Sequence, residues 1–256
     1  MNGAAPRGAA LSGEASGAVL PVLMYHSIGP VPPGSRRRAI HVAERAFALQ
    51  MWMLRQLGWQ GVGIGEAMPW LVGGMPLPPK VCVITFDDGF ANTVSTALPV
   101  LLEHGHRATC YVVASRIGQD NGWSREVLGV TSPLADAHAL RRWTEAGMEL
   151  GAHTLTHPYL TRLSDGALNE EVAGGRRRLQ DLFDLPIDQF CYPYGDHDAR
   201  VVEAVGAAGF VGATTTVRGR ARPLCDPLRI PRVHVLNQHG PIQFLAKLLS
   251  RWGDRA

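Results

Sequence analysis

Cysteine is scarce in this chain of 256 residues, which contains four cysteines and no CxxC pair. A small secreted domain held together by disulfides is therefore excluded, and the wide cysteine spacing argues against a cysteine-based zinc site. Cys82, Cys110 and Cys191 lie in apolar segments, where buried free thiols are expected. The length suits one domain, because α/β barrels routinely use about 250 residues as a single unit.

Charge is also limited. Charged residues make up 18% of the chain, the formal net charge is +3, and lysine occurs only at Lys80 and Lys247. No basic stripe is interleaved with aromatic residues, so we expect no nucleic acid partner. The sequence has no run of about 18 apolar residues, so we expect no membrane span.

The first residues carry few apolar side chains. Residues 1–17 are rich in Ala, Gly and Ser and lack the continuous apolar stretch of a signal peptide. We expect a disordered leader over 1–17 and a single domain over 18–256. The expected location is the cytoplasm on the sequence as given, or the periplasm or extracellular space if the natural chain begins earlier.

Strand-like and helix-like segments alternate along the rest of the chain. Short apolar runs predict about seven strands, at residues 19–25, 80–86, 108–113, 148–152, 189–191, 211–215 and 230–236. Helical spacing of apolar residues predicts helices at 43–57, 94–104, 134–146, 164–183, 199–208 and from 241 onward. This alternation is typical of a parallel α/β architecture. The longest loops are expected at 35–38 and 118–133.

Residues that can bind a metal follow directly after several predicted strands. Asp87 and Asp88 follow the second predicted strand, His153 and His157 follow the fourth, and His26 follows the first. In an α/β barrel the C-terminal ends of the strands meet at one mouth, so these side chains are expected to be neighbours. The two histidines are four residues apart, a spacing that one helical turn brings to one face. Two imidazoles and one carboxylate form a three-ligand set with positions left for water and substrate.

Three motifs of this chain resemble the first three signature motifs of a known family, the polysaccharide deacetylases (carbohydrate esterase family four). They are TFDDG at 85–89, HTLTH at 153–157 and YPYG at 192–195. The opening VLMYH at 22–26 and the segment from Phe47 to Gly58 resemble the branch that acts on poly-N-acetylglucosamine. The resemblance covers nearly the whole chain. It implies an α/β fold, a distorted (β/α) barrel with about seven parallel strands, and metal-dependent removal of N-acetyl groups from an amino-sugar polymer or oligosaccharide.

The resemblance implies roles for the first two motifs. Asp88, His153 and His157 would be the ligands of one divalent metal ion, for which zinc is the first choice and cobalt, nickel, manganese and iron are compatible. Asp87 would be the general base that deprotonates the attacking water. A carboxylate of ordinary strength suffices, because a metal lowers the pKa of water and polarises the acetamide carbonyl.

The third motif would contribute to oxyanion stabilisation and substrate binding. The backbone N–H of Tyr194 would donate to the oxyanion, because Pro193 before it has no N–H to offer. Tyr192, Tyr194 and Trp123 are candidates for stacking on sugar rings. Trp143 has helical spacing relative to Leu140, which favours a place for Trp143 in the core.

The chain departs from the family pattern at two functional positions. The third motif usually begins with an arginine that steers the base, and here Cys191 precedes Tyr192. Arg232 in the last predicted strand is the candidate to orient Asp87 instead, and the alternative is a plain surface arginine. The usual tryptophan-bearing fourth motif is not recognisable.

The general acid for the leaving amine is the second departure, because the fifth motif is not cleanly present. His234 is the candidate, since its alternation with two valines suits a strand with one face inward. His197 and His239 are the rivals, and each of the three is otherwise a solvated loop histidine. His26 is expected beside the site or against the substrate, or as a hydrogen-bonded structural histidine.

Other functions fit parts of the same pattern. The fold and metal site also suit a hydrolase of a small amide or a cyclic ureide, and the irregular later motifs suit a catalytically inactive carbohydrate-binding homologue. An iron-dependent oxygen enzyme uses a similar ligand set, but Asp87 would then have no task. The expected partner is an N-acetylated saccharide, and the sequence indicates no protein partner.

Overall fold

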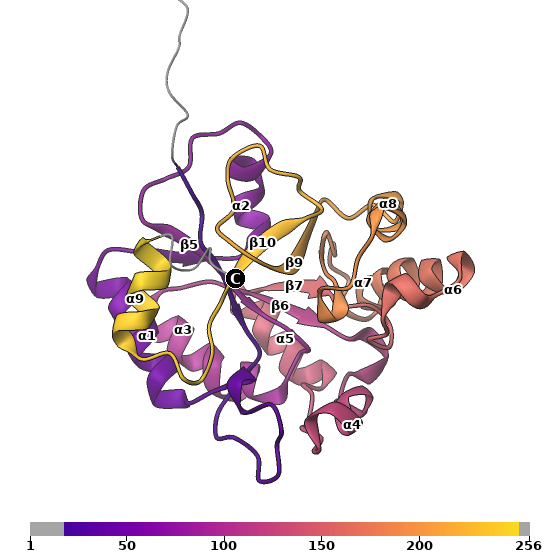
Figure 1. Ribbon diagram of the computed structural model, residues 1–256, viewed down its shortest axis with the longest axis horizontal. Coiled ribbons are helices and arrows are strands. Elements are labelled where there is room, and N and C mark those ends of the chain that lie inside the picture. Colours follow the sequence, from indigo (N-terminus) through magenta and orange to yellow (C-terminus); the bar gives the residue numbers. More distant parts are fainter. Residues whose placement is uncertain (1–17, 251–256) are drawn as a thin grey trace, which may run out of the picture.

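The structure is a computed structural model that describes residues 18–250, in which parallel strands close into a barrel with helices on its outside (Figure 1). The expected leader over 1–17 lies outside the described residues. Seven strands form the ring: β1 (Val22–Tyr25), β5 (Val81–Phe86), β6 (Thr109–Val112), β7 (Glu149–Ala152), β8 (Gln189–Cys191), β9 (Gly212–Arg218) and β10 (Ile230–His234). The predicted α/β barrel of about seven parallel strands is therefore confirmed.

Strand β1 closes the barrel. The strands follow the order β1-β10-β9-β8-β7-β6-β5, and β5 pairs again with β1. In this last pairing Val22 lies opposite Val83 and Tyr25 opposite Phe86. Every residue of β5 is buried, because the interior side chains cover one face and the surrounding helices the other. The N-terminal strand thus lies between two strands that follow it by about 60 and 210 residues.

Most helices lie where the sequence places them, with small differences at their ends. They are α1 (Glu44–Gln56), α3 (Leu98–His104), α4 (Arg125–Leu128), α5 (Ala137–Glu145), α6 (Asp165–Asn169), α7 (Gly175–Phe183), α8 (Ala199–Ala207) and α9 (Pro241–Leu249). Helix α5 begins later than predicted because the Asp136 carboxylate accepts a hydrogen bond from the Ala139 amide at 2.7 Å and caps it. No helix among residues 18–250 combines the length and apolar character needed to cross a membrane.

Five of the strands and helices were not predicted. Helix α4 lies in the segment 118–133, which was expected to be a loop. Strand β4 (Gln60–Val62) pairs with the first half of β5, helix α2 (Ile64–Leu71) follows it, and β2 (Ser27–Ile28) pairs with β3 (His41–Val42). The glycines near β4 hide its pattern, yet one of them is required by packing. A Cβ on Gly61 would clash with the side chain of Ile84, because β4 is wedged against the barrel there.

An aromatic cluster anchors the helices to the strands. The rings of Tyr25, Phe47 and Phe86 contact one another, and Trp143 contacts Phe86, with centroids 5.3 to 5.9 Å apart. Trp143 is fully buried, as its spacing predicted, and its indole N–H donates to the Glu149 carbonyl at 2.8 Å. This packing fixes the ends of β5 and β7, from which the candidate ligands project.

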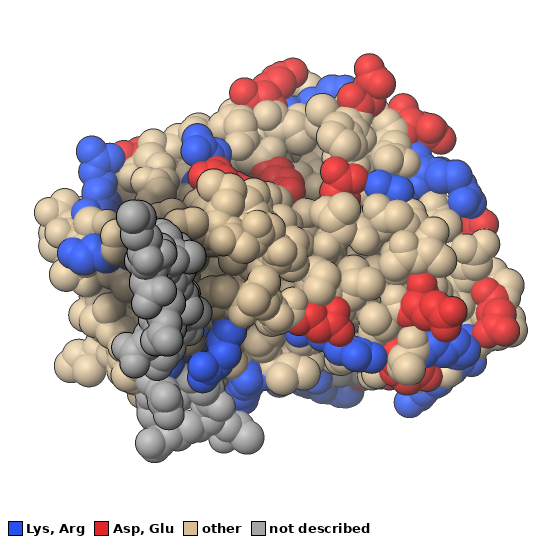
Figure 2. Space-filling view, turned by 90° about the horizontal axis from the view of Figure 1, so that it is seen from above, with Lys and Arg blue, Asp and Glu red and all other residues tan. Residues whose placement is uncertain are grey.

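The surface charges agree with the small net charge of the chain. On the face shown in Figure 2, Lys and Arg side chains are interspersed with Asp and Glu, and uncharged surface occupies most of the middle. No broad basic field covers this face.

Candidate functional site

Three side chains from two strand ends form a metal-type cluster. Asp88 follows β5, His153 follows β7 directly, and His157 lies four residues further. The Asp88 Oδ1 atom is 3.5 Å from His153 Nε2 and 3.3 Å from His157 Nε2, and the two Nε2 atoms are 3.1 Å apart. All three side chains are largely buried. Three ligand atoms at these separations can hold one ion, and this is the predicted metal set.

The strand ends fix the orientation of the first histidine. His153 Nδ1 lies 2.7 Å from the carbonyl oxygen of Cys191, at the end of neighbouring strand β8. A ring nitrogen this close to a carbonyl carries a proton and donates it, which leaves Nε2 as the nitrogen that can bind a metal. A backbone acceptor therefore sets the tautomer that a metal ligand needs.

The spacing of the two histidines suggested a helical turn, but they do not lie on one. Residues 153–157 form a loop, and the backbone is left-handed at Thr154 with φ 66° and at His157 with φ 70°. The Thr154 hydroxyl accepts a hydrogen bond from the His157 amide at 2.9 Å, which closes the loop on itself. Asp88 also has a positive φ, 72°. Such backbone conformations cluster at functional sites, where the surroundings hold them.

A second carboxylate lies beside the cluster and has its own cation. Both oxygens of Asp87 accept hydrogen bonds of 2.7 Å from the guanidinium of Arg232, and Arg232 is fully buried. Burial alone would raise the pKa of Asp87, but the charge and hydrogen bonds of Arg232, together with His26 and His153, hold that pKa below its usual range. The structure thus places Arg232 at the predicted base rather than on the surface.

Other groups hold the guanidinium in place. Arg232 Nε donates to the Thr215 carbonyl at 2.8 Å, and Nη1 donates to the Thr85 hydroxyl at 3.1 Å. Nη2 also donates to Cys191 Sγ at 3.3 Å. The thiol stands where the family pattern has its arginine, and the guanidinium reaches the same place from β10. Asp87, His153 and Cys191 also offer ligand-type atoms close together, but Arg232 already engages two of the three.

A cavity of about 440 Å³ opens above the cluster. Its walls carry both aspartates, both candidate ligand histidines and a set of residues from the loops around the barrel mouth. These are Met24, His26, Arg37, Ile40, Tyr159, Tyr192, Tyr194, Thr216, His234 and Leu236. His26 Nε2 lies 3.9 Å from Asp87 Oδ2. His26 is thus a partly exposed neighbour of a buried carboxylate.

Only one of the three histidines considered as general acid lines this cavity. His234 does so, with its Nε2 at 2.9 Å from the Thr216 carbonyl. Burial, with help from nearby cations, lowers the pKa of His234 to about 4, so its ring is neutral near pH 7. His197 Nδ1 lies against the Gly195 carbonyl, and His239 Nδ1 accepts from the Leu236 amide.

Aromatic rings form one wall of the cavity. Tyr194 stacks on Tyr159 with centroids 4.1 Å apart, and Tyr159 is partly exposed. Trp123 stacks on His157 at 4.8 Å and so covers a candidate ligand rather than standing free. Tyr192 is buried and donates its hydroxyl proton to the Leu228 carbonyl. Sequence reasoning missed Tyr159, although its place two residues after the HTLTH motif was a usable signal.

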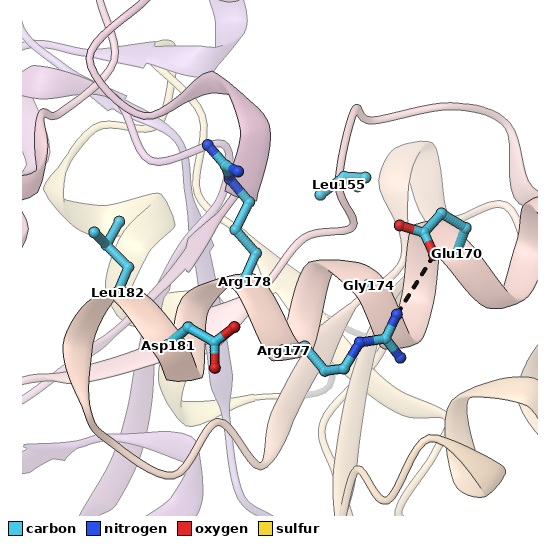
Figure 3. Close-up of a pocket in the computed structure, with 7 residues that line it drawn as sticks. All are labelled: Leu155, Glu170, Gly174, Arg177, Arg178, Asp181 and Leu182. Atoms are coloured by element: carbon cyan, nitrogen blue, oxygen red, sulfur yellow. Dashed lines mark hydrogen bonds and ion pairs between the residues drawn. The ribbon is translucent and has the colours of Figure 1, made fainter.

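A separate hollow lies along α7 and the helical segment Glu170–Gly174 before it, with Leu155 on its other side (Figure 3). Arg177 and Glu170 pair there at 3.4 Å, and Arg178 Nε donates to the Ala114 carbonyl at 3.0 Å. None of the residues predicted to carry chemistry lines it. The barrel mouth is therefore where the candidate residues meet.

Comparison with known sequences gives a consistent result. Residues 74–213 match the family described as Polysaccharide deacetylase. YxkH of Bacillus subtilis, a protein named for this family, is 26% identical over 204 residues, which cover 80% of this chain and 67% of YxkH. The poly-beta-1,6-N-acetyl-D-glucosamine N-deacetylase of Escherichia coli is 25% identical over 248 residues, covering 84% of this chain and 36% of that enzyme. The chain thus spans about a third of the length of the Escherichia coli protein.

Solved structures share the barrel. The Streptococcus pyogenes deacetylase PplD, determined with acetate, has a TM-score of 0.77 at 22% identity, covering 89% of this chain and 97% of that one. IcaB from Ammonifex degensii has a TM-score of 0.75 at 25% identity, covering 93% of this chain and 98% of that one. These similarities show that the closed seven-stranded barrel with outer helices is a fold shared with such deacetylases.

Proposed function

The chain belongs to the polysaccharide deacetylase family, and from this premise we propose that it hydrolyses the N-acetyl group of an acetylated amino sugar in a polymer or oligosaccharide. One observation carries the proposal: a buried carboxylate, Asp87, lies beside a three-ligand cluster but is engaged by Arg232 instead of joining it. A structural metal site has no need of such a neighbour. A hydrolytic site needs a base near the open coordination positions.

The donor set fits a divalent ion, and we propose zinc. Asp88, His153 and His157 would hold it, since their ligand atoms are 3.1 to 3.5 Å apart. Ligands about 2.0–2.1 Å from a tetrahedral zinc lie about 3.3–3.4 Å from one another. When bound, such an ion lowers the pKa of water and polarises an amide carbonyl.

The base and its partner divide the remaining work. Asp87 accepts a proton from the attacking water, and its low pKa keeps it ionised near neutral pH. The bidentate contact with Arg232 fixes the plane of the carboxylate, so one lone-pair direction faces the cavity. Tyr194 lines the wall after Pro193, and its backbone N–H is the proposed donor to the tetrahedral oxyanion.

Besides the two candidate metal ligands, two imidazoles line the cavity and compete for the role of proton donor to the leaving amine. The Nε2 atom of His234 is occupied by the Thr216 carbonyl, and its pKa of about 4 leaves it without a second proton at neutral pH. His26 lies 3.9 Å from Asp87, close to the group that takes the first proton. We therefore propose His26 as the general acid in preference to His234.

Alanine variants of the two histidines separate these roles. We expect His26→Ala to lower kcat by about 100- to 1,000-fold, the usual contribution of a positioned proton donor. His234→Ala should lower kcat by less than about tenfold, because its ring contacts the wall and not the base. Steady-state acetate release, with metal content measured for both variants, checks this. The opposite ranking would return the role to His234.

The proposed function is tested by metal analysis combined with acetate release. We expect about one divalent ion per chain, loss of at least about 100-fold of activity after chelation, and recovery on adding zinc. Substrates should be acetylated glucosamine oligosaccharides, with simple acetamides and cyclic ureides as the comparison. Acetate release that is equally fast from small amides would favour the amide hydrolase alternative. No release from any compound would contradict a hydrolytic function.

A further inference from the structure

The rim of the cavity carries cations whose charges the protein itself does not use. We propose that the substrate bears an anionic group, a phosphoryl or a carboxylate, next to the acetylated sugar, and that Arg37 with Arg162 and Arg218 binds it. This rests on the proposed function, and it narrows the substrate class within that function. The anion is the shared chemistry, and the experiment below distinguishes its two sources.

Of these three cations, Arg37 is the one that lines the cavity itself. It lines the cavity together with His26 and Asp87, and its side chain is exposed. The chain next to it is anchored, because Arg36 Nη1 donates to the Glu126 carbonyl at 3.0 Å. No hydrogen bond or ion pair joins the Arg37 guanidinium to any of residues 18–250. An anchored loop therefore presents a free guanidinium at the cavity wall.

Two further arginines lie next to residues of the cavity wall. The guanidinium of Arg162 lies over the ring of Tyr159, 4.3 Å from its centroid, and Tyr159 lines the cavity. Arg218 ends β9 two residues after Thr216, another wall residue. Neither arginine has a carboxylate partner within the described part of the chain. Three elements thus carry arginines without a carboxylate partner at the cavity wall or next to its residues.

No carboxylate of the cavity wall balances this charge. Asp87 and Asp88 are the acidic wall residues among those described. Arg232 neutralises the first, and the second belongs to the proposed metal set. The pattern differs elsewhere on the molecule, where Arg200 pairs with Asp165 at 2.9 Å and Arg107 pairs with Glu66 at 3.1 Å.

Two histidines near the rim respond to this positive field. Burial is the main cause that lowers the pKa of His234 to about 4, and Arg232 and Arg218 lower it further. Burial also lowers the pKa of His239 to about 4, with help from Lys247 and Arg218. Because burial is the main cause in both cases, these shifts support the proposal only by showing that Arg218 lies close enough to act on His234, a residue of the cavity wall.

Arginine is well suited to the group proposed. Its planar guanidinium binds phosphate and carboxylate through two parallel hydrogen bonds, and its charge persists at any physiological pH. Unpaired cations around a cleft also raise the local concentration of an anionic ligand, an effect that added salt screens. A neutral saccharide would gain neither contribution.

The first experiment compares three acetylated glucosamine trisaccharides that differ in one substituent: a neutral one, one with a phosphoryl group and one with a carboxylate. At 20 mM salt we expect kcat/KM to be at least about tenfold higher for one anionic compound than for the neutral one. At 500 mM salt this advantage should shrink several-fold. The better anionic compound identifies the source of the charge. Equal kcat/KM for all three would overturn the inference and leave the proposed function intact.

The second experiment assigns the effect to Arg37. In Arg37→Gln the ratio of kcat/KM between anionic and neutral compounds should fall by about three- to tenfold. Arg142→Gln, an equivalent change at an exposed arginine of α5, should leave the ratio unchanged. An unchanged ratio in Arg37→Gln would remove Arg37 from the proposal.

Binding to chelator-treated protein provides a measurement that does not need turnover. Calorimetry should show tighter binding of the anionic trisaccharide than of the neutral one, and this preference should be lost in Arg37→Gln. Since no metal is present, ligation of phosphate by an ion cannot produce the result. If no saccharide is hydrolysed, the proposed function fails, and this binding difference alone decides the inference. Equal binding of both compounds would overturn it.

Discussion

Replacing Asp87 with asparagine should lower kcat by about 1,000-fold while the protein still binds its metal ion. An amide cannot accept the proton of the attacking water, which removes general base catalysis. The substitution leaves the three proposed metal ligands unchanged, and the new amide oxygen can still accept a hydrogen bond from Arg232. This variant should therefore lose turnover and keep the metal content of the wild type. Acetate release and elemental analysis on one preparation measure both.

The same change on the outer surface provides the control. Asp181→Asn alters an exposed carboxylate of α7 and should leave both quantities at wild-type values. If Asp87→Asn keeps more than about a tenth of the activity, Asp87 is not the base. If the wild-type chain binds saccharide but releases no acetate, it is a carbohydrate-binding homologue that has lost turnover.

Replacing Arg232 with methionine should destabilise the fold by about 3–5 kcal/mol at pH 7. The change leaves Asp87 buried without a cation, and breaking a buried pair from one side costs about that much. Urea unfolding measures the difference. The double variant Arg232→Met with Asp87→Asn should recover part of the loss, because no buried charge then remains unpaired. A single variant as stable as the wild type would show that the pair is not desolvated as the structure indicates.

The cost of removing Arg232 should depend on pH. In the wild type the folded-state pKa of Asp87 is lowered, so this group stabilises the fold above its unfolded pKa and loses that effect as pH falls. Without Arg232 burial raises the pKa of Asp87 instead, so the folded state is penalised as pH rises. The stability difference should therefore widen between about pH 4 and pH 7. Unfolding curves across this range test the sign.

The sequence allows the barrel to be predicted because its strands are apolar on both faces. The run Val81–Phe86 has one environment throughout, and its pattern indicates a buried parallel strand without further information. The region of β4 and α2 gives no such signal. Gly61, Gly63 and Gly65 interrupt the strand and helix patterns, and Pro69 lies inside the helix. Their selection reflects contacts with other parts of the barrel, which the local sequence does not contain.

In the candidate site, too, some features follow from the sequence and others depend on how distant segments pack. The proximity of Asp88 and His153 follows from parallel strands whose C-terminal ends meet, so motif spacing was enough. The contact between Asp87 and Arg232 joins residues 145 positions apart. The sequence named Arg232 as a candidate but left a surface position open, and the register of β10 decides between the two. Neither the stacking of Trp123 on His157 nor the left-handed loop between the histidines has a local signature. Both depend on how separate loops pack around the mouth.

The place of β1 between β5 and β10 has a consequence for synthesis on the ribosome. Until β10 has emerged, β1 has a neighbour on one side only, and the nascent sheet exposes unpaired edges. Asp87 also has no guanidinium partner before β10 has emerged, since Arg232 belongs to β10. Closing the ring and completing the reactive carboxylate are thus one event. Chains stalled before that event would be inactive and prone to join one another edge to edge.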